Sequence, residues 1–181
     1  MIAIMTPDHV TRLLACAERD VRLADGRRVF GSGEGVRFLF VVREGGVRML
    51  RRQRNGSVLV LQRARPGELV AEASLFAPRY HCEAIAEGPT VLARIPKPLV
   101  AEHLLADAGW LAAFAAHLAS EVQRTRGRAE LLSLKRVDER VDAWLALNGG
   151  TAPDRGRWGD WANELAVSPE ALYRELARRR G

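Results

Sequence analysis

The residues with the clearest chemical potential lie near the C-terminal end of the sequence, where Glu170 and Arg174 are four positions apart. On a helix this spacing places both side chains on one face. Residues at the start of such a helix can meet base edges in the major groove of DNA, and a later arginine is available for guanine or phosphate. The alternative is an exposed ion pair, which stabilises a helix by about 0.3 kcal/mol.

Two short helices that share a tight turn are predicted to carry this pair. The first covers residues 158–165 and the second residues 169–178, with apolar residues spaced by four in the second. Ser168 followed by Pro169 marks the start of the second helix, because serine caps a helix and proline fits its first position. Ala162 is small where the two helices would cross. The pattern predicts a helix-turn-helix whose DNA-facing side chains are Ser168, Pro169, Glu170, Tyr173, Arg174 and Arg178.

Cysteine and histidine are too sparse and too scattered for a metal centre. The two cysteines, Cys16 and Cys82, form neither a Cys-x-x-Cys pair nor a spaced zinc pattern, so we expect free thiols. Of the four histidines only His81 lies within residues 21–96, the sheet-rich part of the chain. A metal-dependent enzyme built on a β-barrel needs several histidines and a carboxylate that converge inside the barrel. We therefore expect no metal, no catalytic residue and no enzyme activity.

The composition favours a polyanionic partner. Lys and Arg number 28 against 22 Asp and Glu, which gives a net charge of +6. No apolar stretch approaches the roughly 18 residues that a membrane-spanning helix needs. The first residues lack the basic region, apolar run and cleavage site of a signal peptide. We expect a cytoplasmic protein with no membrane partner.

Short strands separated by turns are predicted for the first half of the chain. Asn55-Gly56 favours a tight hairpin turn, because both residues readily adopt positive φ values. Further turns are predicted at residues 44–46 and at Gly88-Pro89. Many short antiparallel strands indicate a barrel or jelly roll. The predicted strands cover residues 38–42, 47–52, 58–61, 81–86 and 90–95.

The second half of the chain has the composition of helices, with no proline between Pro98 and Pro153. A stripe of residues at alternating spacings of four and three predicts one long helix at residues 108–134. The stripe could pack on the barrel. A helix of this length spans roughly 40 Å, however, and exceeds what a small barrel covers, so a second copy of the chain is the expected partner. The predicted dimer seam is Leu111, Ala115, Leu118, Val122, Thr125, Ala129 and Leu132.

The chain as a whole resembles the Crp/Fnr superfamily of transcription regulators, which carry a cyclic-nucleotide-binding jelly roll, a dimer helix and a winged helix-turn-helix. The strongest matches are residues 38–47, which resemble the family's strand, glycine turn and strand, and residues 66–76, which resemble its phosphate-binding cassette. The resemblance implies an α+β fold with an N-terminal β jelly-roll barrel. It divides the chain into an effector-sensing domain at 1–107, a dimerisation helix at 108–136 and a helix-turn-helix DNA-binding domain at 137–181.

The resemblance also places an effector pocket in the barrel. Glu72 matches the family's ribose-binding acid, Ala71 replaces a glycine, and His81-Cys82 stand where cyclic-AMP-binding members have Arg-Ser. A cyclic phosphate without a charged partner is costly to bury, so we expect the pocket to have lost cyclic AMP binding, with no cofactor and either no effector or another ligand. The implied effector-binding residues are Ala71, Glu72, Ala73, His81, Cys82 and Thr125, the last on the dimer helix.

The predicted recognition helix matches the family pattern Ser-Arg-Glu-Thr-Val-x-Arg at Ser168, Glu170 and Arg174, with Pro169 in place of an arginine. The sequence ends soon after this helix, so we expect the family's wing to be absent and the terminal arginines to supply phosphate contacts in its place. The resemblance implies a dimeric regulator whose partners are double-stranded DNA, a second copy of the chain and RNA polymerase. The alternative is a wingless interaction protein that pairs with another regulator instead of binding DNA.

Overall fold

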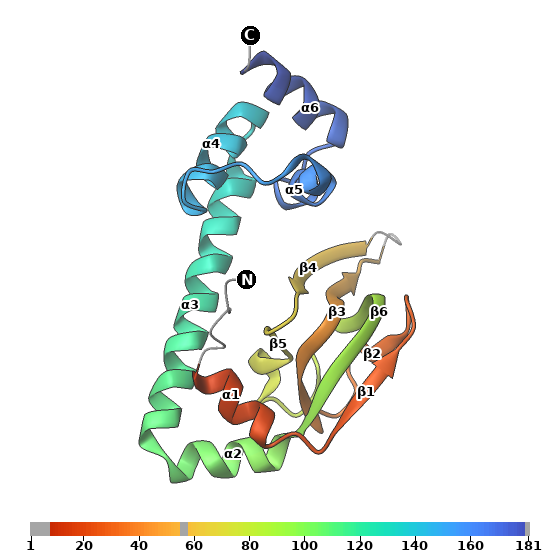
Figure 1. The fold of residues 1–181 in the computed structure, drawn as a ribbon, viewed down its shortest axis with the longest axis vertical. Coiled ribbons are helices and arrows are strands. Elements are labelled where there is room, and N and C mark those ends of the chain that lie inside the picture. The colour runs from red at the N-terminus through yellow and green to blue at the C-terminus, as the bar shows by residue number, and fades with distance from the viewer. Residues whose placement is uncertain (1–7, 55–57, 180–181) are drawn as a thin grey trace. The chain divides into compact units, whose positions relative to one another are not determined.

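The computed structural model describes residues 8–54 and 58–179 (Figure 1). The chain divides into two compact units, Met1–Leu118 and Ala119–Gly181, and the boundary falls within the long helix α3, Ala108–Ser133. The predicted Asn55-Gly56 turn lies outside the described residues. Each unit is described by itself below.

The first unit is built on an antiparallel sheet with the order β1-β6-β3-β4, in which β2 also pairs with β6 and β5 with β3 (Figure 1). The long strands β3 and β6 form the centre of the sheet and pair along most of their length. The elements are α1 (Asp8–Ala15), β1 (Arg19–Leu23), β2 (Arg28–Phe30), β3 (Phe38–Arg52), β4 (Val58–Ala64), β5 (Leu69–Val70), η1 (Glu72–Ser74), β6 (Glu83–Pro96) and α2 (Lys97–Ala106).

The predicted turns at residues 44–46 and at Gly88-Pro89 are wrong, because β3 and β6 run through both sites without a break. The register between the two strands shifts on either side of Glu44, so the extra residues form bulges. Gly45 and Gly88 both have a φ of 75°, and a Cβ on Gly45 would collide with the carbonyl oxygen of Pro89. These glycines therefore bend two long strands instead of separating short ones.

The hairpin predicted around residues 55–56 is supported by the strands on either side. β3 and β4 pair antiparallel, and the last pair before the turn joins Arg52 to Val58. The strand predicted at 58–61 continues to Ala64.

Both faces of the sheet are buried, which explains the unbroken apolar run at the start of β3. Successive side chains on a strand point to opposite faces. Phe40 and Val42 pack on one face of the sheet with Phe30 and Tyr80. Leu39 and Val41 pack on the other face, against the helices. The helices contribute Val10, Leu13, Val100, Leu104, Trp110 and Phe114 to this second cluster.

The beginning of α3 belongs to the core of the first unit. Trp110 and Phe114 are 3% and 2% exposed and pack against the sheet. They lie on a different stripe of the helix from the predicted seam. Of the predicted seam residues, Leu118 packs against this core, whereas Leu111 stays 44% exposed.

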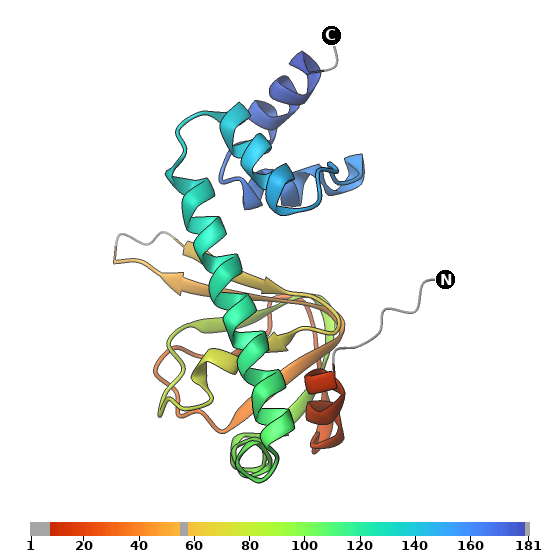
Figure 2. The same cartoon turned by 90° about the vertical axis from the view of Figure 1, so that its left-hand side faces the viewer.

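The second unit is helical and contains the predicted helix-turn-helix (Figure 2). Trp161, Leu165 and Leu172 are almost fully buried at its centre, and Ala162 is 0% exposed between the two helices. The prediction of two short helices at 158–165 and 169–178 is confirmed. The elements are the end of α3, α4 (Val137–Leu147), η2 (Arg155–Arg157), α5 (Trp158–Glu164) and α6 (Pro169–Arg178).

Within residues 8–54 and 58–179 no single helix is long and apolar enough to cross a membrane. The helices α2 and α3, which are bent by 117°, pass this test only as a pair, by length and composition.

Candidate functional site

Helix α6 begins at the predicted cap. The backbone N–H of Ala171 donates to the Ser168 hydroxyl at 3.2 Å, and Pro169 occupies the first helical position, where no N–H is needed. Leu172 and Leu176 face the core at 0% and 8% exposure. One side of the helix is thereby fixed to the unit, and the other side is left to solvent.

The exposed side of α6 carries all six residues predicted to face DNA: Ser168, Pro169, Glu170, Tyr173, Arg174 and Arg178. The backbone N–H of Glu170 and the hydroxyl of Ser168 lower the pKa of the Glu170 carboxyl, and the Arg174 guanidinium adds to this effect. Glu170 is therefore ionised at neutral pH and able to accept hydrogen bonds. We call this surface the recognition face.

The turn before α6 is held by a residue that the sequence pattern did not reveal. Ala166 adopts a left-handed conformation with a φ of 51°. The Arg140 guanidinium of α4 donates to the carbonyl oxygens of Leu165 and Ala166, each at 2.9 Å, and its Nε donates to that of Leu134 at 2.9 Å. One cation thus binds carbonyl groups at the C-terminal ends of both α3 and α5, where helix dipoles favour positive charge.

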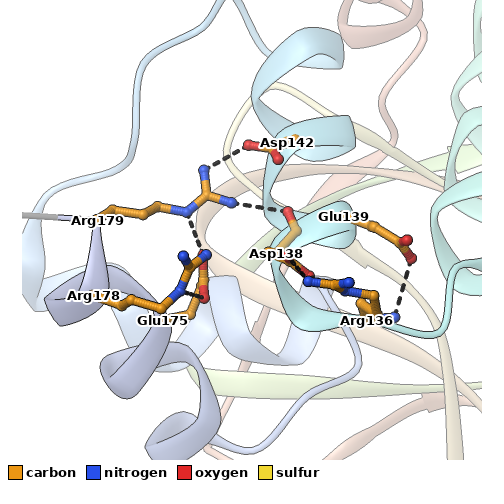
Figure 3. Close-up of polar contacts among 7 residues, drawn as sticks. All are labelled: Arg136, Asp138, Glu139, Asp142, Glu175, Arg178 and Arg179. Atoms are coloured by element: carbon orange, nitrogen blue, oxygen red, sulfur yellow. Dashed lines mark hydrogen bonds and ion pairs between the residues drawn. The ribbon is translucent and has the colours of Figure 1, made fainter.

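The last two described arginines are tied to acidic groups (Figure 3). Arg178 makes two hydrogen bonds to the Glu175 carboxylate, at 2.8 and 3.0 Å. Arg179 donates to Glu175 and to Asp142, both at 2.6 Å, and to the backbone oxygen of Asp138 at 2.9 Å. Hydrogen bonds from Arg178 lower the pKa of Glu175. We call Glu175, Arg179, Asp142 and Asp138 the α4–α6 clamp.

The clamp changes the role predicted for the terminal arginines. The sequence predicts phosphate contacts, but Arg179 holds α6 to α4 and only 27% of its side chain is exposed. Arg178, with 66% of its side chain exposed, stays on the recognition face although its guanidinium is paired with Glu175. The N-terminal end of α4 adds a further pair, because Arg136 binds Asp138 at 2.6 Å (Figure 3).

The first unit contains a small pocket of about 50 Å³ at the predicted effector site. Such a volume holds a few water molecules. Ala71 stands at its edge in a left-handed conformation, with a φ of 76°, in a position where a glycine would be unstrained. The lining residues are Phe30, Met49, Leu61, Gln62, Ala71, Glu72, Ala73, Ser74, His81 and Cys82.

Among the residues described, the pocket lining carries one carboxylate, that of Glu72, and no lysine or arginine. Glu72 is 6% exposed, and His81 Nδ1 lies 3.3 Å from the hydroxyl of buried Ser74. His81 and Cys82 precede β6 and both line the pocket, although His81 is exposed and Cys82 is only 2% exposed. Burial raises the pKa of the Cys82 thiol. The Arg51 guanidinium opposes this shift, and the Glu72 carboxylate adds to it.

Two arginines near the pocket are engaged by backbone oxygens. Arg79 donates to the carbonyl of Gly33 at 2.7 Å. Arg51, which the sequence pattern did not single out, donates to the carbonyl of His81 at 3.2 Å. Both are exposed at the surface of the first unit.

The predicted dimer seam is mostly open to solvent. Leu111, Val122 and Leu132 are 44%, 48% and 39% exposed, and Ala115, Thr125 and Ala129 are also exposed. Leu118 is half-buried because it packs against the core of the first unit. Thr125, assigned to the effector site by resemblance, lies on α3 in the second unit, whereas the other five assigned residues lie in the first.

In the described part of the chain no three His, Cys, Asp or Glu residues gather in a way that could hold a metal ion. Cys16 and Cys82 are free thiols.

Comparison with known proteins supports the fold. Residues 20–107 match the family described as Cyclic nucleotide-binding domain. The fold is similar to FixK2 from Bradyrhizobium japonicum, with a TM-score of 0.71 and 19% identity over 88% of this chain and 83% of that one. The fold is also similar to that of the c-di-GMP responsive global regulator CLP from Xanthomonas campestris. The TM-score is 0.65 and the sequence identity 22%, over 95% of this chain and 90% of that one. The predicted fold class is confirmed.

A transcriptional regulator of the CRP family from Thermus thermophilus is similar as well, with a TM-score of 0.61 and 23% identity over 88% of this chain and 84% of that one. The chain matches no curated protein sequence.

Proposed function

We propose that the chain is a sequence-specific DNA-binding transcriptional regulator of the Crp/Fnr type, because residues 20–107 match the Cyclic nucleotide-binding domain family and the fold is similar to that of solved transcriptional regulators. The observation that carries the proposal is the recognition face, where Glu170 and Arg174 are both exposed on one side of a capped and firmly packed helix. An arginine in this position can make two hydrogen bonds to guanine. Glu170 occupies the first turn, the part of a recognition helix that meets base edges.

The regulator acts as a homodimer in this proposal. The seam on α3 leaves large apolar side chains in solvent, among them Leu111, Val122 and Leu132. A second copy of the same helix would cover them at the spacing of a coiled coil. Two recognition faces related by twofold symmetry then read a roughly palindromic site whose halves are about one helical turn apart. RNA polymerase is the further partner that such a regulator would contact.

The pocket in the first unit favours a ligand other than cyclic AMP. A cyclic phosphate carries a full negative charge, and the described lining offers it a buried carboxylate, Glu72, and no lysine or arginine. Arg51 and Arg79 would first have to leave the carbonyl groups that they bind. The CLP regulator is described as responsive to c-di-GMP, so a protein of this fold can respond to a signal other than cyclic AMP. We propose a pocket that is tuned to another ligand or unused.

The experiment that tests the proposal is selection of genomic DNA fragments with the purified full chain, followed by titration of the enriched site. Arg174→Ala should weaken binding by about 1–3 kcal/mol and relax the preference at one position of each half-site. An absence of any enriched sequence would favour an interaction protein that acts without contacting DNA. Calorimetric titration with cyclic AMP and cyclic GMP tests the pocket, and micromolar binding abolished by Glu72→Ala would contradict its altered state.

A further inference from the structure

The arginines of the second unit differ in how fully they are engaged by the protein itself. Arg140 binds backbone carbonyls, Arg136 is paired with Asp138, and Arg179 belongs to the α4–α6 clamp. Arg155 and Arg157, which begin and end η2, are exposed. Among the residues that the structure describes, no carboxylate lies within ion-pair distance of either. These two guanidinium groups are therefore available to an anion from outside.

Aromatic contacts place the η2 segment beside the recognition face. The guanidinium carbon of Arg155 lies 5.9 Å from the centroid of the Trp158 ring. The Trp158 ring in turn lies 5.3 Å from the ring of Tyr173, centroid to centroid. Tyr173 is 42% exposed on α6, whereas Trp158 is only 6% exposed and its indole N–H donates to the Pro153 carbonyl at 3.0 Å. A buried indole therefore links an exposed arginine of η2 to an exposed tyrosine of α6.

This arrangement suits phosphate better than it suits a base. A guanidinium on an aromatic ring is held in place at little entropic cost and still presents its N–H groups outward, and it matches the geometry of phosphate oxygens. Arg178 can reach an external phosphate only by giving up its two bonds to Glu175. Arg155 and Arg157 break no such pair when they meet an anion, although Asp154 and Asp160 lie close to them in sequence.

We propose that Arg155 and Arg157 form an anchor for the DNA phosphate backbone beside the recognition face, an inference that rests on the proposed function. The anchor sets the position and orientation of α6 on the duplex and carries no sequence information of its own. Arg179, by contrast, holds α6 to α4.

The test compares Arg155→Gln and Arg157→Gln in the full chain with Arg22→Gln, which also removes an exposed arginine, from β1 in the first unit. Affinity is measured for the selected site and for an unrelated duplex between about 50 and 200 mM salt. Each anchor variant should lose about tenfold in affinity for both duplexes, and the slope of log K against log salt should fall by about 0.9. Arg155→Lys should retain most of that slope, because it keeps the charge, and Arg22→Gln should bind like the unchanged protein.

The outcomes separate the anchor from the function on which it rests. If the unchanged protein binds a selected duplex and neither anchor variant changes the affinity or the salt slope, the anchor is overturned and the proposed function stands. A loss confined to the selected site also overturns it, because it indicates a base contact. A protein that binds no duplex overturns both. Thermal unfolding midpoints equal to those of the unchanged protein exclude misfolding as the cause of a loss.

Discussion

Replacing Arg140 with alanine should destabilise the helix-turn-helix unit far more than an exposed arginine normally does. The side chain makes three hydrogen bonds of 2.9 Å to the carbonyls of Leu134, Leu165 and Ala166. A hydrogen bond to a charged group contributes about 1.5–3 kcal/mol when it is well shielded from water. Because Arg140 is half-buried and the freed carbonyls regain part of their hydration, we expect a total loss of about 2–4 kcal/mol.

Urea unfolding followed by tryptophan fluorescence is the appropriate assay. Trp144, Trp158 and Trp161 all lie in the second unit, so the signal reports mainly on that unit. The control is Arg136→Ala, which removes an arginine from the start of the same helix. The Arg136 side chain is 70% exposed, and an ion pair made by an exposed arginine adds little to stability.

Equal losses of stability in the two variants would contradict this expectation. If Arg140→Ala costs no more than Arg136→Ala, the carbonyl bonds of Arg140 add nothing beyond a surface charge. Arg140→Lys gives a further check, because an ammonium group keeps the charge but cannot reach the ends of two helices at once. We expect it to recover at most half of the loss.

Three further predictions concern the seam, the turn and the clamp. Val122→Glu should convert dimers to monomers in sedimentation experiments, because it places a charge in the seam, whereas Ala116→Glu, also exposed on α3, should leave the dimer intact. Ala166→Gly should raise the free energy of unfolding by about 0.5–1 kcal/mol by relieving a left-handed alanine, while Ala116→Gly within a helix should lower it by about 1 kcal/mol. The pKa of Glu175 is lowered in the folded state, so its contribution to stability is present above its unfolded pKa of about 4.3 and is lost as the pH falls. The thermal unfolding midpoint should therefore fall less steeply from about pH 6 to about pH 3 in Glu175→Gln than in the unchanged protein.

Each of these predictions has a contrary outcome. A dimer that survives Val122→Glu would mean that another surface joins the two copies. A loss of stability in Ala166→Gly would mean that the turn tolerates its φ without strain. An acid transition that keeps the same steepness in Glu175→Gln would remove the clamp as a source of pH dependence.

The helical half of the fold follows closely from the sequence because its signals are local. The Ser168-Pro169 start, the small Ala162 at the helix crossing and the long apolar periodicity of α3 each depend on neighbours within a few residues. All three are found in the structure.

The sheet was harder to predict because a glycine supports either a turn or a bulge. Gly45 and Gly88 have the positive φ expected of turn residues. Both nevertheless lie within continuous strands, because β3 and β6 pair with each other on either side of them. Register between distant strands is set by packing on both faces of a sheet and has no short-range signature.

The site residues that sequence reasoning missed act across distance. Arg140 reaches carbonyls about 25 positions away, and Arg179 reaches Asp142 on another helix. The composition does not show which arginines are engaged in ion pairs within the fold. The basic C-terminal end was therefore expected to contact phosphate. The aromatic link from Arg155 to Tyr173 likewise requires the fold, since Trp158 stands in the sequence as an ordinary core residue.

Binding of the purified full chain to genomic DNA fragments, with Arg174→Ala measured in parallel, is the decisive experiment for the proposed regulator. The proposed function predicts an enriched, roughly palindromic sequence, and a variant that loses about 1–3 kcal/mol at that site while it binds unrelated duplexes as before. Recovery of no common sequence, or equal binding of both proteins to the enriched site, would contradict it.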